Sequence, residues 1–410
     1  MLSNKDKKFL EKIINKLSKS DNFNKIASYP LLEKGFTNED IYSGAEVLLS
    51  KKITMSSITK KFEKAFAKYV GSKYALMVNS GSSANLLSSF ALLNPKKKNR
   101  LKSGDTFVIP ALCWSTSLWP FVQAGLKPKF LDVDIKTFCL DDKLIKKEKN
   151  IKAIVNLHIL GNCSNILEIQ KFAKKNRLFL IEDTCEALGS KYKSKFLGTF
   201  GDFGTYSFYY SHQITSGEGG MIVCKSKEDY ELIHSMRAHG WDRGLAKNHK
   251  NNFNFINSGF NLRPLDLTAA IGLSQLKRLN KMIKVRAQNR KLLINALKNS
   301  IQWKNQFTFF EPNNNLNPSW FGFPILINNK YQKNKQRYLN YLNSSGVETR
   351  PILSGNFLNQ PSAKLYGFNK KNEKFKNSQD IEDRGFFIGL PTKEISVNTL
   401  KFLTEKLLKI

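Results

Sequence analysis

The sequence predicts an α/β fold, in which helices cover both faces of a mostly parallel sheet. Short, nearly continuous apolar runs alternate with helical segments, and each run ends at a polar or Gly-containing turn. The runs lie at 74–78, 106–110, 128–133, 152–159, 178–183 and 204–210, and helical segments are expected at 58–70 and 82–93. Strands of this kind, separated by helices, are typical of a parallel sheet that is buried on both sides.

Two further segments flank this region. Residues 4–17 carry apolar residues at helical spacing, which predicts an N-terminal amphipathic helix. Long helical periodicity over 264–297, followed by an apolar run at 319–327 and the segment near 347–352, indicates a smaller α+β domain at the end of the chain. The predicted division is a helical segment over 1–37, a large α/β domain over 38–285 and a small α+β domain over 286–410.

The composition is that of a large globular protein. The chain has 410 residues, of which 41% are hydrophobic and 12% aromatic, so it can bury a core and is not a disordered basic tail. Its 66 Lys and Arg exceed its 33 Asp and Glu, which gives a formal charge of +33. A basic protein attracts polyanions. The excess is mostly Lys, spread along the chain with Asn, Ile and Phe, whose codons are AT-rich, so genome bias explains it better than a nucleic-acid site.

Neither a membrane span nor a metal centre is predicted. The apolar runs, such as 178–181, are far shorter than the roughly 20 residues that cross a bilayer, and the N-terminus alternates charged and apolar residues. An odd number of cysteines is scattered along the chain without a CxxC pair or a His-Cys cluster: Cys113, Cys139, Cys163, Cys185 and Cys224. We expect reduced thiols, no bound metal and a cytoplasmic location.

The first candidate motif is NSGSSAN at 79–85, between a predicted strand and a predicted helix. Its small residues let backbone N–H groups and hydroxyls approach an anion, which the N-terminus of a helix attracts. A strand-to-helix turn is rich in Gly and Ser in any case, so an ordinary turn remains the alternative.

The second candidate motif is EDTCE at 182–186, which ends the apolar strand LFLI. The carboxyl ends of strands are the edge at which α/β sheets bind ligands. A carboxylate there can hold a ring nitrogen protonated, as the electron sink of a pyridoxal-type cofactor requires. The alternative is an Asp that caps the next helix.

The third candidate motif is SFYYSHQ at 207–213, which is followed by the Gly-rich turn TSGEGG at 215–220. A lone histidine such as His212 is more often structural than catalytic. Its place between a strand and a Gly-rich turn nevertheless favours exposure to a pocket. The residues alone leave both readings open.

Together with GFNLRPLDLTAAIGLSQL at 259–276, these motifs resemble the DegT/DnrJ/EryC1/StrS family of vitamin B6-dependent sugar-modifying enzymes over nearly the whole chain. The resemblance implies the fold type I architecture of PLP-dependent aminotransferases, with the large domain binding the cofactor. In the family's aminotransferases, the position of His212 is a Lys that forms a Schiff base with PLP. Because His cannot form a stable Schiff base, the substitution implies the 3-dehydratase branch, which uses non-covalently bound pyridoxamine phosphate (PMP).

Two types of 3-dehydratase are known, and the cysteines separate them. The type that acts on CDP-sugars needs a Cys close after the cofactor Asp, which Cys185 matches, and a trio of cysteines downstream. The downstream stretch 236–255 contains no cysteine. We therefore expect no iron–sulfur cluster, as in the type that acts on GDP-sugars, which NLHILGN, RAHGWDR, SWFGF and TRPILSGNF also resemble.

The resemblance thus implies removal of the C3 hydroxyl of GDP-4-keto-6-deoxy-D-mannose in deoxysugar and O-antigen biosynthesis, with L-glutamate regenerating PMP. One alternative is a CDP-4-keto-6-deoxyglucose 3-dehydratase, and another is a sugar-nucleotide aminotransferase whose Lys lies elsewhere. A third, from a different class, is a non-catalytic nucleic-acid-binding protein. We expect neither nucleic acid nor a membrane as a partner.

The resemblance also implies roles around the cofactor. His212 is the base that moves protons, Asp183 pairs with the pyridinium nitrogen and Trp114 stacks on the ring. Glu186 lies near the 3-hydroxyl of the cofactor. The residues expected to hold the phosphate are Gly81, Ser82 and Ser207. The ordinary alternative, most relevant to Trp114, is a place in the core.

Three further residues are expected to act beyond the cofactor. Asn261 would reach the phosphate of the neighbouring subunit's cofactor, which implies a homodimer with shared sites. Arg243 and Arg263 would bind the diphosphate of the nucleotide sugar or the glutamate carboxylate, with a surface salt bridge as the alternative. One departure leaves the nucleotide open: residues 389–391 are Gly-Leu-Pro, where the GDP-sugar type has Gly-Asn-His.

Overall fold

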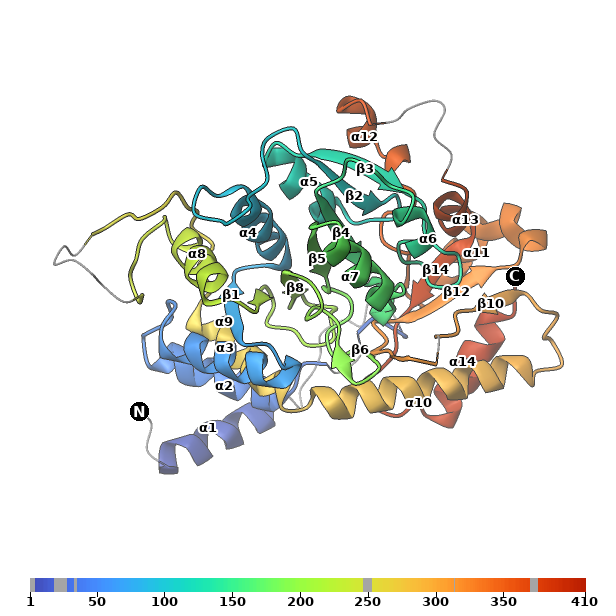
Figure 1. Cartoon of the computed structure of the whole chain (residues 1–410). Helices are drawn as coiled ribbons and strands as arrows, with labels where there is room; N and C mark the ends of the chain where they lie inside the picture. The colour runs from blue at the N-terminus through green and yellow to red at the C-terminus, as the bar shows by residue number, and fades with distance from the viewer. Residues whose placement is uncertain (1–3, 18–27, 33–34, 246–252, 313, 369–374) are drawn as a thin grey trace.

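The computed structural model contains a large sheet with the strand order β1-β9-β8-β5-β4-β2-β3 (Figure 1). The structure describes residues 4–17, 28–32, 35–245, 253–312, 314–368 and 375–410. The strands are β1 (Tyr74–Val78), β2 (Thr106–Pro110), β3 (Lys127–Leu131), β4 (Ala153–Leu157), β5 (Phe179–Asp183), β8 (Phe203–Ser207) and β9 (Gly220–Cys224). β9 pairs antiparallel with β1 and β8, whereas the pairs from β8 to β3 are parallel. The prediction of a mostly parallel sheet is confirmed.

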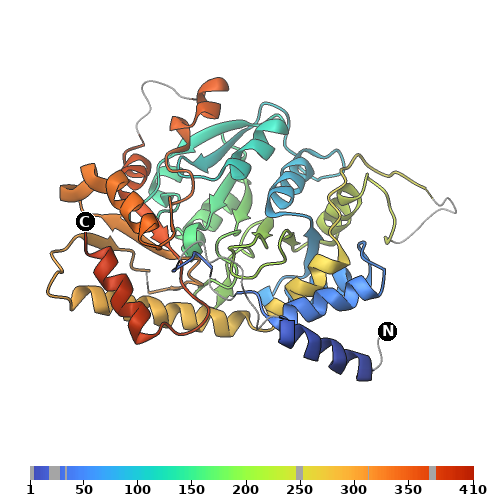
Figure 2. The same cartoon turned by 180° about the vertical axis from the view of Figure 1, so that it is seen from behind.

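Helices cover both faces of this sheet (Figures 1 and 2). Successive residues of β1 point to opposite faces: Leu76 and Val78 belong to the core that contains α4, and Ala75 and Met77 to the core that contains α3. Burial on both faces explains why such strands are continuously apolar. The helices around the sheet are α2 (Asn38–Leu49), α3 (Ser57–Val70), α4 (Gly81–Leu93), α5 (Ser115–Gln123), α6 (Asp142–Ile145), α7 (Ile166–Lys175) and α8 (Lys227–Arg237).

The helical segment predicted over 264–297 consists of two helices, α9 (Asp266–Leu276) and α10 (Leu279–Lys298). The two residues between them keep backbone angles close to helical, with φ and ψ of −60° and −28° at Lys277 and −102° and −7° at Arg278. Because neither residue is Gly or Pro, the sequence carries no signal for this break. α10 then runs beneath both parts of the molecule (Figure 1).

The C-terminal part is built on a four-stranded antiparallel sheet with the order β10-β12-β14-β13. Its elements are β10 (Phe307–Phe309), β12 (Phe323–Ile327), α11 (Lys335–Ser344), β13 (Thr349–Arg350), α12 (Pro361–Leu365), α13 (Lys376–Arg384), β14 (Gly385–Ile388) and α14 (Val397–Leu407). In a third small sheet, β6 (Lys191–Tyr192) lies in the middle and pairs with β11 (Leu316–Asn317) on one side and β7 (Lys195–Phe196) on the other. Because α10 continues through residues 285 and 286, the proposed domain boundary there stays a prediction.

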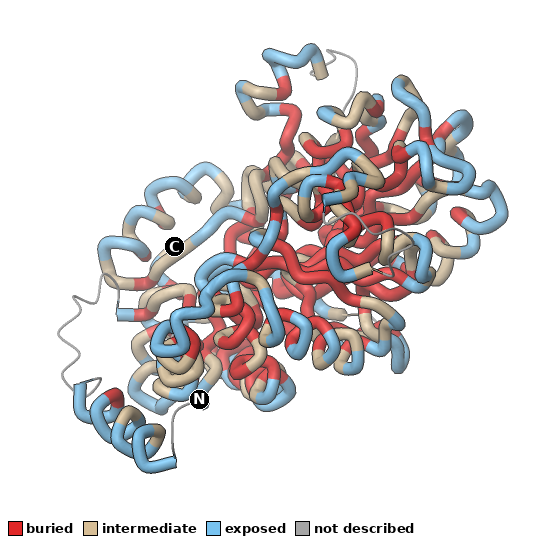
Figure 3. The backbone as a smooth tube through the Cα atoms, turned by 90° about the vertical axis from the view of Figure 1, so that its left-hand side faces the viewer, coloured by how far each residue is buried: buried red, intermediate tan, exposed pale blue. Residues whose placement is uncertain are grey.

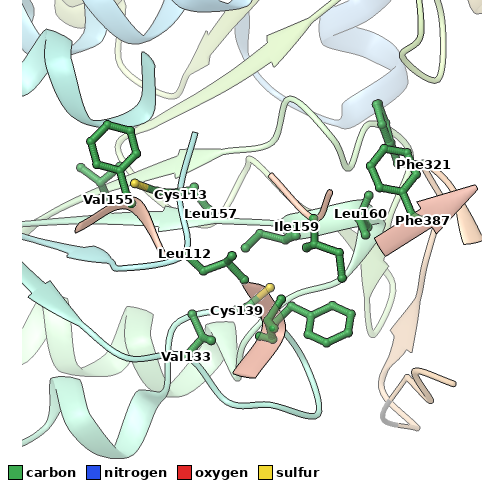
Figure 4. Close-up of a cluster of buried hydrophobic side chains, with 14 of the residues drawn as sticks. Leu112, Cys113, Val133, Cys139, Val155, Leu157, Ile159, Leu160, Phe321 and Phe387 are labelled. Atoms are coloured by element: carbon green, nitrogen blue, oxygen red, sulfur yellow. The ribbon is translucent and has the colours of Figure 1, made fainter. Parts of the chain in front are cut away.

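The two parts share one apolar core. Figure 4 shows Leu157, the last residue of β4, and Ile159 and Leu160 just after it, in one cluster with Phe321 and Phe387 of the C-terminal part. The rings of Phe321 and Phe387 meet edge to face, with their centroids 5.8 Å apart. The carboxyl end of β4 is therefore packed directly against the C-terminal part.

The N-terminal segment touches both parts. α1 (Asn4–Leu17) is the amphipathic helix that the sequence predicts, and its Lys7 forms an ion pair of 2.9 Å with Glu46 of α2. Most of α1 is exposed (Figure 3). Tyr29 forms a β-bridge with Val347, and its hydroxyl donates to the carbonyl of Gly389 at 3.0 Å. The helical segment predicted over 1–37 also includes residues 1–3, 18–27 and 33–34, which lie outside the described residues.

Within the described ranges, no helix combines the length and the apolar character that a membrane crossing needs. The same part of the chain contains no group of three or more His, Cys, Asp or Glu side chains that could hold a metal ion.

Candidate active site

The NSGSSAN turn brings the N-terminus of α4 against the carboxyl ends of β8 and β5. A Cβ atom added at Gly81 would lie 2.6 Å from Cβ of Ser207 and 3.1 Å from Sγ of Cys185, so the close approach requires glycine. Ser80 caps the helix by accepting from the backbone N–H of Ser83 at 3.0 Å. Ser82, in the first turn, donates to Oγ1 of Thr116 at 3.1 Å. The turn therefore presents hydroxyls and a helix N-terminus at one place, as an anion site requires.

Asp183 ends β5 and is held by three donors. Its Oδ2 accepts from Nδ2 of Asn85 at 2.9 Å and from Oγ of Ser117 at 2.7 Å, and its Oδ1 accepts from the N–H of Cys185 at 3.2 Å. Thr205 donates to Oδ1 of Asn85 at 2.7 Å, which turns the amide N–H₂ of Asn85 toward the carboxylate. The carboxylate is thus fixed in orientation by helices α4 and α5 and by the next strand.

The sequence reasoning did not assign these partners of Asp183. Asn85 is the last residue of the NSGSSAN motif and lies one turn into α4, so its side chain faces the sheet. This position in the motif is the one sequence feature that points to Asn85 as a partner of Asp183. Ser117 and Thr205 are ordinary residues of a helix and a strand, and nothing local distinguishes them from core residues.

His212 lies half-buried between β8 and β9. Its ring packs edge to face against Phe321, with centroids 5.0 Å apart, and against Tyr209 at 6.0 Å. Nδ1 of His212 is buried, and no group in the described part of the chain forms a hydrogen bond with it. Burial, together with the positive charge of Arg286, lowers the pKa of His212 to about 3. The imidazole is therefore uncharged at neutral pH and can accept a proton.

Glu186 follows Asp183 by three residues and turns toward the loop after β4. Its Oε2 accepts from the backbone N–H of Leu160 at 2.9 Å. Burial raises the pKa of Glu186 to about 7, and the charge of Asp183 acts in the same direction. The side chain is thus a carboxyl group that changes charge close to neutral pH.

The raised pKa of Glu186 predicts a stability that depends on pH. The folded protein binds a proton at Glu186 between the ordinary pKa of 4.5 and about 7, so this group stabilises the fold below pH 4.5, and the contribution is lost as the pH rises through 7. We expect Glu186→Gln, which remains neutral, to lose less stability than the unaltered protein between pH 5 and 8. Urea unfolding at several pH values measures this. Parallel curves for both proteins would contradict it, and Glu231→Gln on α8 is the control.

The remaining predicted residues lie at the surface of the single chain. Trp114 precedes α5 and its side chain is 53% exposed. Asn261 and Arg263 are exposed and contact each other, because Nε of Arg263 donates to Oδ1 of Asn261 at 3.0 Å. The guanidinium of Arg243 lies 5.1 Å from the centre of the Trp241 ring. No hydrogen bond or ion pair of the described residues joins these side chains to Asp183 or His212.

The backbone nevertheless places GFNLRP next to the NSGSSAN turn. The N–H of Asn79 donates to the carbonyl of Leu262 at 3.1 Å, so Asn261 lies close to the end of β1. Residues 389–391, where the sequence differs from the GDP-sugar type, are buried. Their backbone carbonyls accept hydrogen bonds from α10: that of Leu390 from Nε of Arg286 at 3.1 Å, and that of Pro391 from Asn289 at 3.1 Å.

Solved structures share this architecture over nearly the whole chain. An Escherichia coli structure described as GDP-4-keto-6-deoxy-D-mannose-3-dehydratase with bound hydrated PLP superimposes with a TM-score of 0.85 and 37% identity, covering 93% of this chain and 99% of that one. A structure of GDP-4-keto-6-deoxymannose-3-dehydratase with a trapped PLP-glutamate geminal diamine gives 0.84 and 36%, covering 93% and 100%. The fold is therefore that of the PLP-dependent aminotransferases.

The sequence comparison narrows this class to one family. The chain belongs to the DegT/DnrJ/EryC1/StrS aminotransferase family, whose model matches residues 36–396. It is 38% identical over 375 residues to a GDP-4-keto-6-deoxy-D-mannose 3-dehydratase of Escherichia coli O55:H7, an alignment that covers 88% of this chain and 95% of the relative.

Proposed function

We propose that this protein removes the C3 hydroxyl of GDP-4-keto-6-deoxy-D-mannose, with PMP as the bound cofactor and L-glutamate as the donor that restores PMP. The observation that carries the proposal is His212. It is an uncharged, half-buried imidazole between β8 and β9, where the family's aminotransferases have a Lys. The relatives with GDP-4-keto-6-deoxy-D-mannose 3-dehydratase names support the substrate.

The described residues fit PLP and PMP. The N-terminus of α4 offers an anion site at Gly81, Ser82 and Ser207, and a Cβ added at Gly81 would have no room beside Ser207. Asp183 is a buried carboxylate fixed by three donors, suited to a protonated ring nitrogen. We assign the phosphate to the first group and the pyridinium nitrogen to Asp183. Trp114 would cover the ring, and Glu186 would approach its 3-hydroxyl.

The chemistry divides between the cofactor and the protein. When bound, the cofactor supplies an electron sink that allows a proton to be exchanged beside the amine and the C3 hydroxyl to leave. His212 holds the proton: the neutral imidazole takes it from the cofactor's C4′ carbon and the resulting imidazolium gives it to the leaving hydroxyl. Phe321 and Tyr209 pack against the ring of His212, which restricts its orientation and excludes water from its buried side.

The overall reaction converts the sugar and PMP into the 3-deoxy-4-keto sugar, PLP and ammonia. The experiment that tests it incubates the PMP form with GDP-, CDP- and dTDP-4-keto-6-deoxyhexoses. We expect ammonia release and a product lighter by one oxygen atom with the GDP-linked mannose derivative. A brown protein that contains iron and sulfide and acts on the CDP-sugar would instead favour a CDP-4-keto-6-deoxyglucose 3-dehydratase. Borohydride trapping of the cofactor on a lysine would favour an aminotransferase.

We propose in addition that the active form is a homodimer with shared sites. Two sets of exposed groups support this: Asn261 with Arg263 beside the NSGSSAN turn, and large apolar side chains on α1 and α2. The latter are Phe9, Leu17, Leu48 and Leu49, each between 55% and 65% exposed. We infer that these exposed apolar side chains belong to the interface with the second chain.

Subunit mixing tests the sharing of sites. His212→Asn and Asn261→Ala would each be inactive alone. If Asn261 serves the site of the neighbouring subunit, mixed dimers contain one intact site, and an equal mixture recovers about a quarter of the unaltered activity. If Asn261 serves its own subunit, both sites of the mixed dimer are defective and no activity returns. Sedimentation of the unaltered protein measures the assembly itself.

A further inference from the structure

Gln213, which directly follows His212 in the chain, is a buried amide without an assigned role. It is 2% exposed. Nε2 of Gln213 donates to the backbone carbonyl of Glu186 and, at 3.1 Å, to Oγ of Ser319. A carbonyl oxygen can only accept, so this contact fixes which end of the amide is the N–H₂ group. Gln213 thus joins the segment that carries His212 to the loop after β5 and to the C-terminal part.

The two N–H donors explain this amide better than the filling of space does. Oε1 of Gln213 is buried with no hydrogen-bond partner in the described part of the chain. A buried carbonyl without a partner costs free energy, and a methionine of similar length would fill the same volume without that cost. We infer that the side chain is polar because of what its N–H₂ group holds.

Ser319, one of the two acceptors, is fixed in turn by Ser190. Ser319 is fully buried, its N–H donates to Oγ of Ser190 at 2.9 Å, and the two hydroxyl oxygens form a hydrogen bond of 3.0 Å. Oγ of Ser190 donates to the carbonyl of Gly161 at 2.7 Å. A buried chain of hydrogen bonds therefore runs from Gln213 through Ser319 and Ser190 to the turn after β4.

The segment that begins at Ser319 also carries the ring against which His212 packs. Phe321 lies in the core shared by the two parts (Figure 4), and its ring meets the imidazole edge to face, with centroids 5.0 Å apart. Trp320, just before it, has a left-handed φ of 50°, and a Cβ added at Gly161 would lie 2.8 Å from its backbone N. A left-handed residue with a side chain persists only where its neighbours determine it, so Phe321 keeps one position.

We propose that Gln213 is a positioning residue that holds His212 in place through Ser319 and Glu186, an inference that rests on the proposed function. Two adjacent residues hold one short segment of the C-terminal part: His212 by its ring contact with Phe321, and Gln213 by its hydrogen bond to Ser319. Gln213 neither takes nor gives a proton. It keeps the backbone of His212 at a fixed distance from Phe321, and proton transfer by the imidazole tolerates little displacement.

The first test compares single turnovers of the PMP form at saturating sugar. Gln213→Met keeps the length of the side chain and removes both N–H donors. We expect C3 deoxygenation, measured per bound cofactor, to fall by about 10- to 100-fold, while the sugar concentration that gives half the maximal rate stays the same. Gln306→Met is the matched control, because Gln306 is a buried amide whose side chain bonds to the backbone of Gln302 and Lys304. An unchanged rate in Gln213→Met, or an equal loss in both variants, overturns the proposal.

A double-variant cycle tests whether Gln213 acts through Ser319. Ser319→Ala removes one acceptor, and it should lower the rate less than Gln213→Met does, because the bond to the carbonyl of Glu186 remains. In the double variant, the loss should stay close to that of Gln213→Met alone, since the bond that Ser319→Ala breaks is already missing. Two losses that multiply would show that the residues act independently, and the proposal would fail.

A spectroscopic test needs no turnover. The chain contains five histidines, so the Cε1–H signal of His212 in PLP-loaded protein with carbon-13-labelled histidine is assigned by its loss in His212→Asn. The ring current of Phe321 makes this signal sensitive to the position of the imidazole. We expect Gln213→Met to shift the signal and Gln306→Met to leave it in place. A signal that does not move in Gln213→Met overturns the proposal. If the unaltered protein acts on no sugar, the proposed function fails, and the spectrum still tests whether Gln213 positions His212.

Discussion

Replacing His212 by Asn is expected to reduce C3 deoxygenation by about 10²- to 10⁴-fold, the range that a lost general acid–base group produces. Asn is close to His in size and polarity but cannot accept and return a proton. The proposed reaction needs both events, the first at the cofactor's C4′ carbon and the second at the leaving hydroxyl. Ammonia release in a single turnover of the PMP form measures the combined effect.

Binding of PMP by the same variant should change little, because His212 is proposed to act on protons and not on affinity. The structure supports the separation: the proposed anion site at Gly81 and the carboxylate of Asp183 make no hydrogen bond to His212 within the described residues. His234→Asn provides the control, since His234 is a partly buried histidine on α8. If His212→Asn turns over at a near-normal rate, another group is the base.

The sheet could be predicted from the sequence because its signal is local. A strand that is buried on both faces is apolar at every position, so β1 and β2 were located to the residue at 74–78 and 106–110. β9 escaped prediction because it begins at Gly220, the last glycine of the TSGEGG turn, so its start resembles a loop. Its antiparallel direction depends on where the chain re-enters the sheet, and no local pattern records that.

The sequence indicates only part of the candidate site, because residues that meet there lie far apart along the chain. Asp183 ends β5 and His212 comes after β8, so the rule that ligands bind at the carboxyl ends of strands selects both as candidates. One of the three donors that orient Asp183, Asn85, is 98 positions away along the chain. The assignments of Asn261, Arg243 and Arg263 rest on the family resemblance and stay predictions.

Replacing Asp183 by Asn is expected to lower the rate of deoxygenation by a factor of several hundred or more. The reason is that a buried ion pair between this carboxylate and a protonated ring nitrogen would lose one partner, which costs about 3–5 kcal/mol. The ring would then lose its proton and with it most of its capacity to hold an electron pair. The amide oxygen of Asn can still accept from Asn85 and Ser117, the present partners of Oδ2, so we expect the fold to survive.

Two further measurements isolate the charge of Asp183 from its hydrogen bonds. Ser117→Ala removes one donor to the carboxylate and keeps its charge, so its loss of activity should be about one order of magnitude or less. A cofactor analogue methylated at the ring nitrogen carries a permanent positive charge and needs no carboxylate to stay charged. It should therefore restore turnover in Asp183→Asn relative to natural PMP. If the analogue gives no such gain, or if the Asn variant keeps its activity with PMP, Asp183 orients the ring without setting its charge.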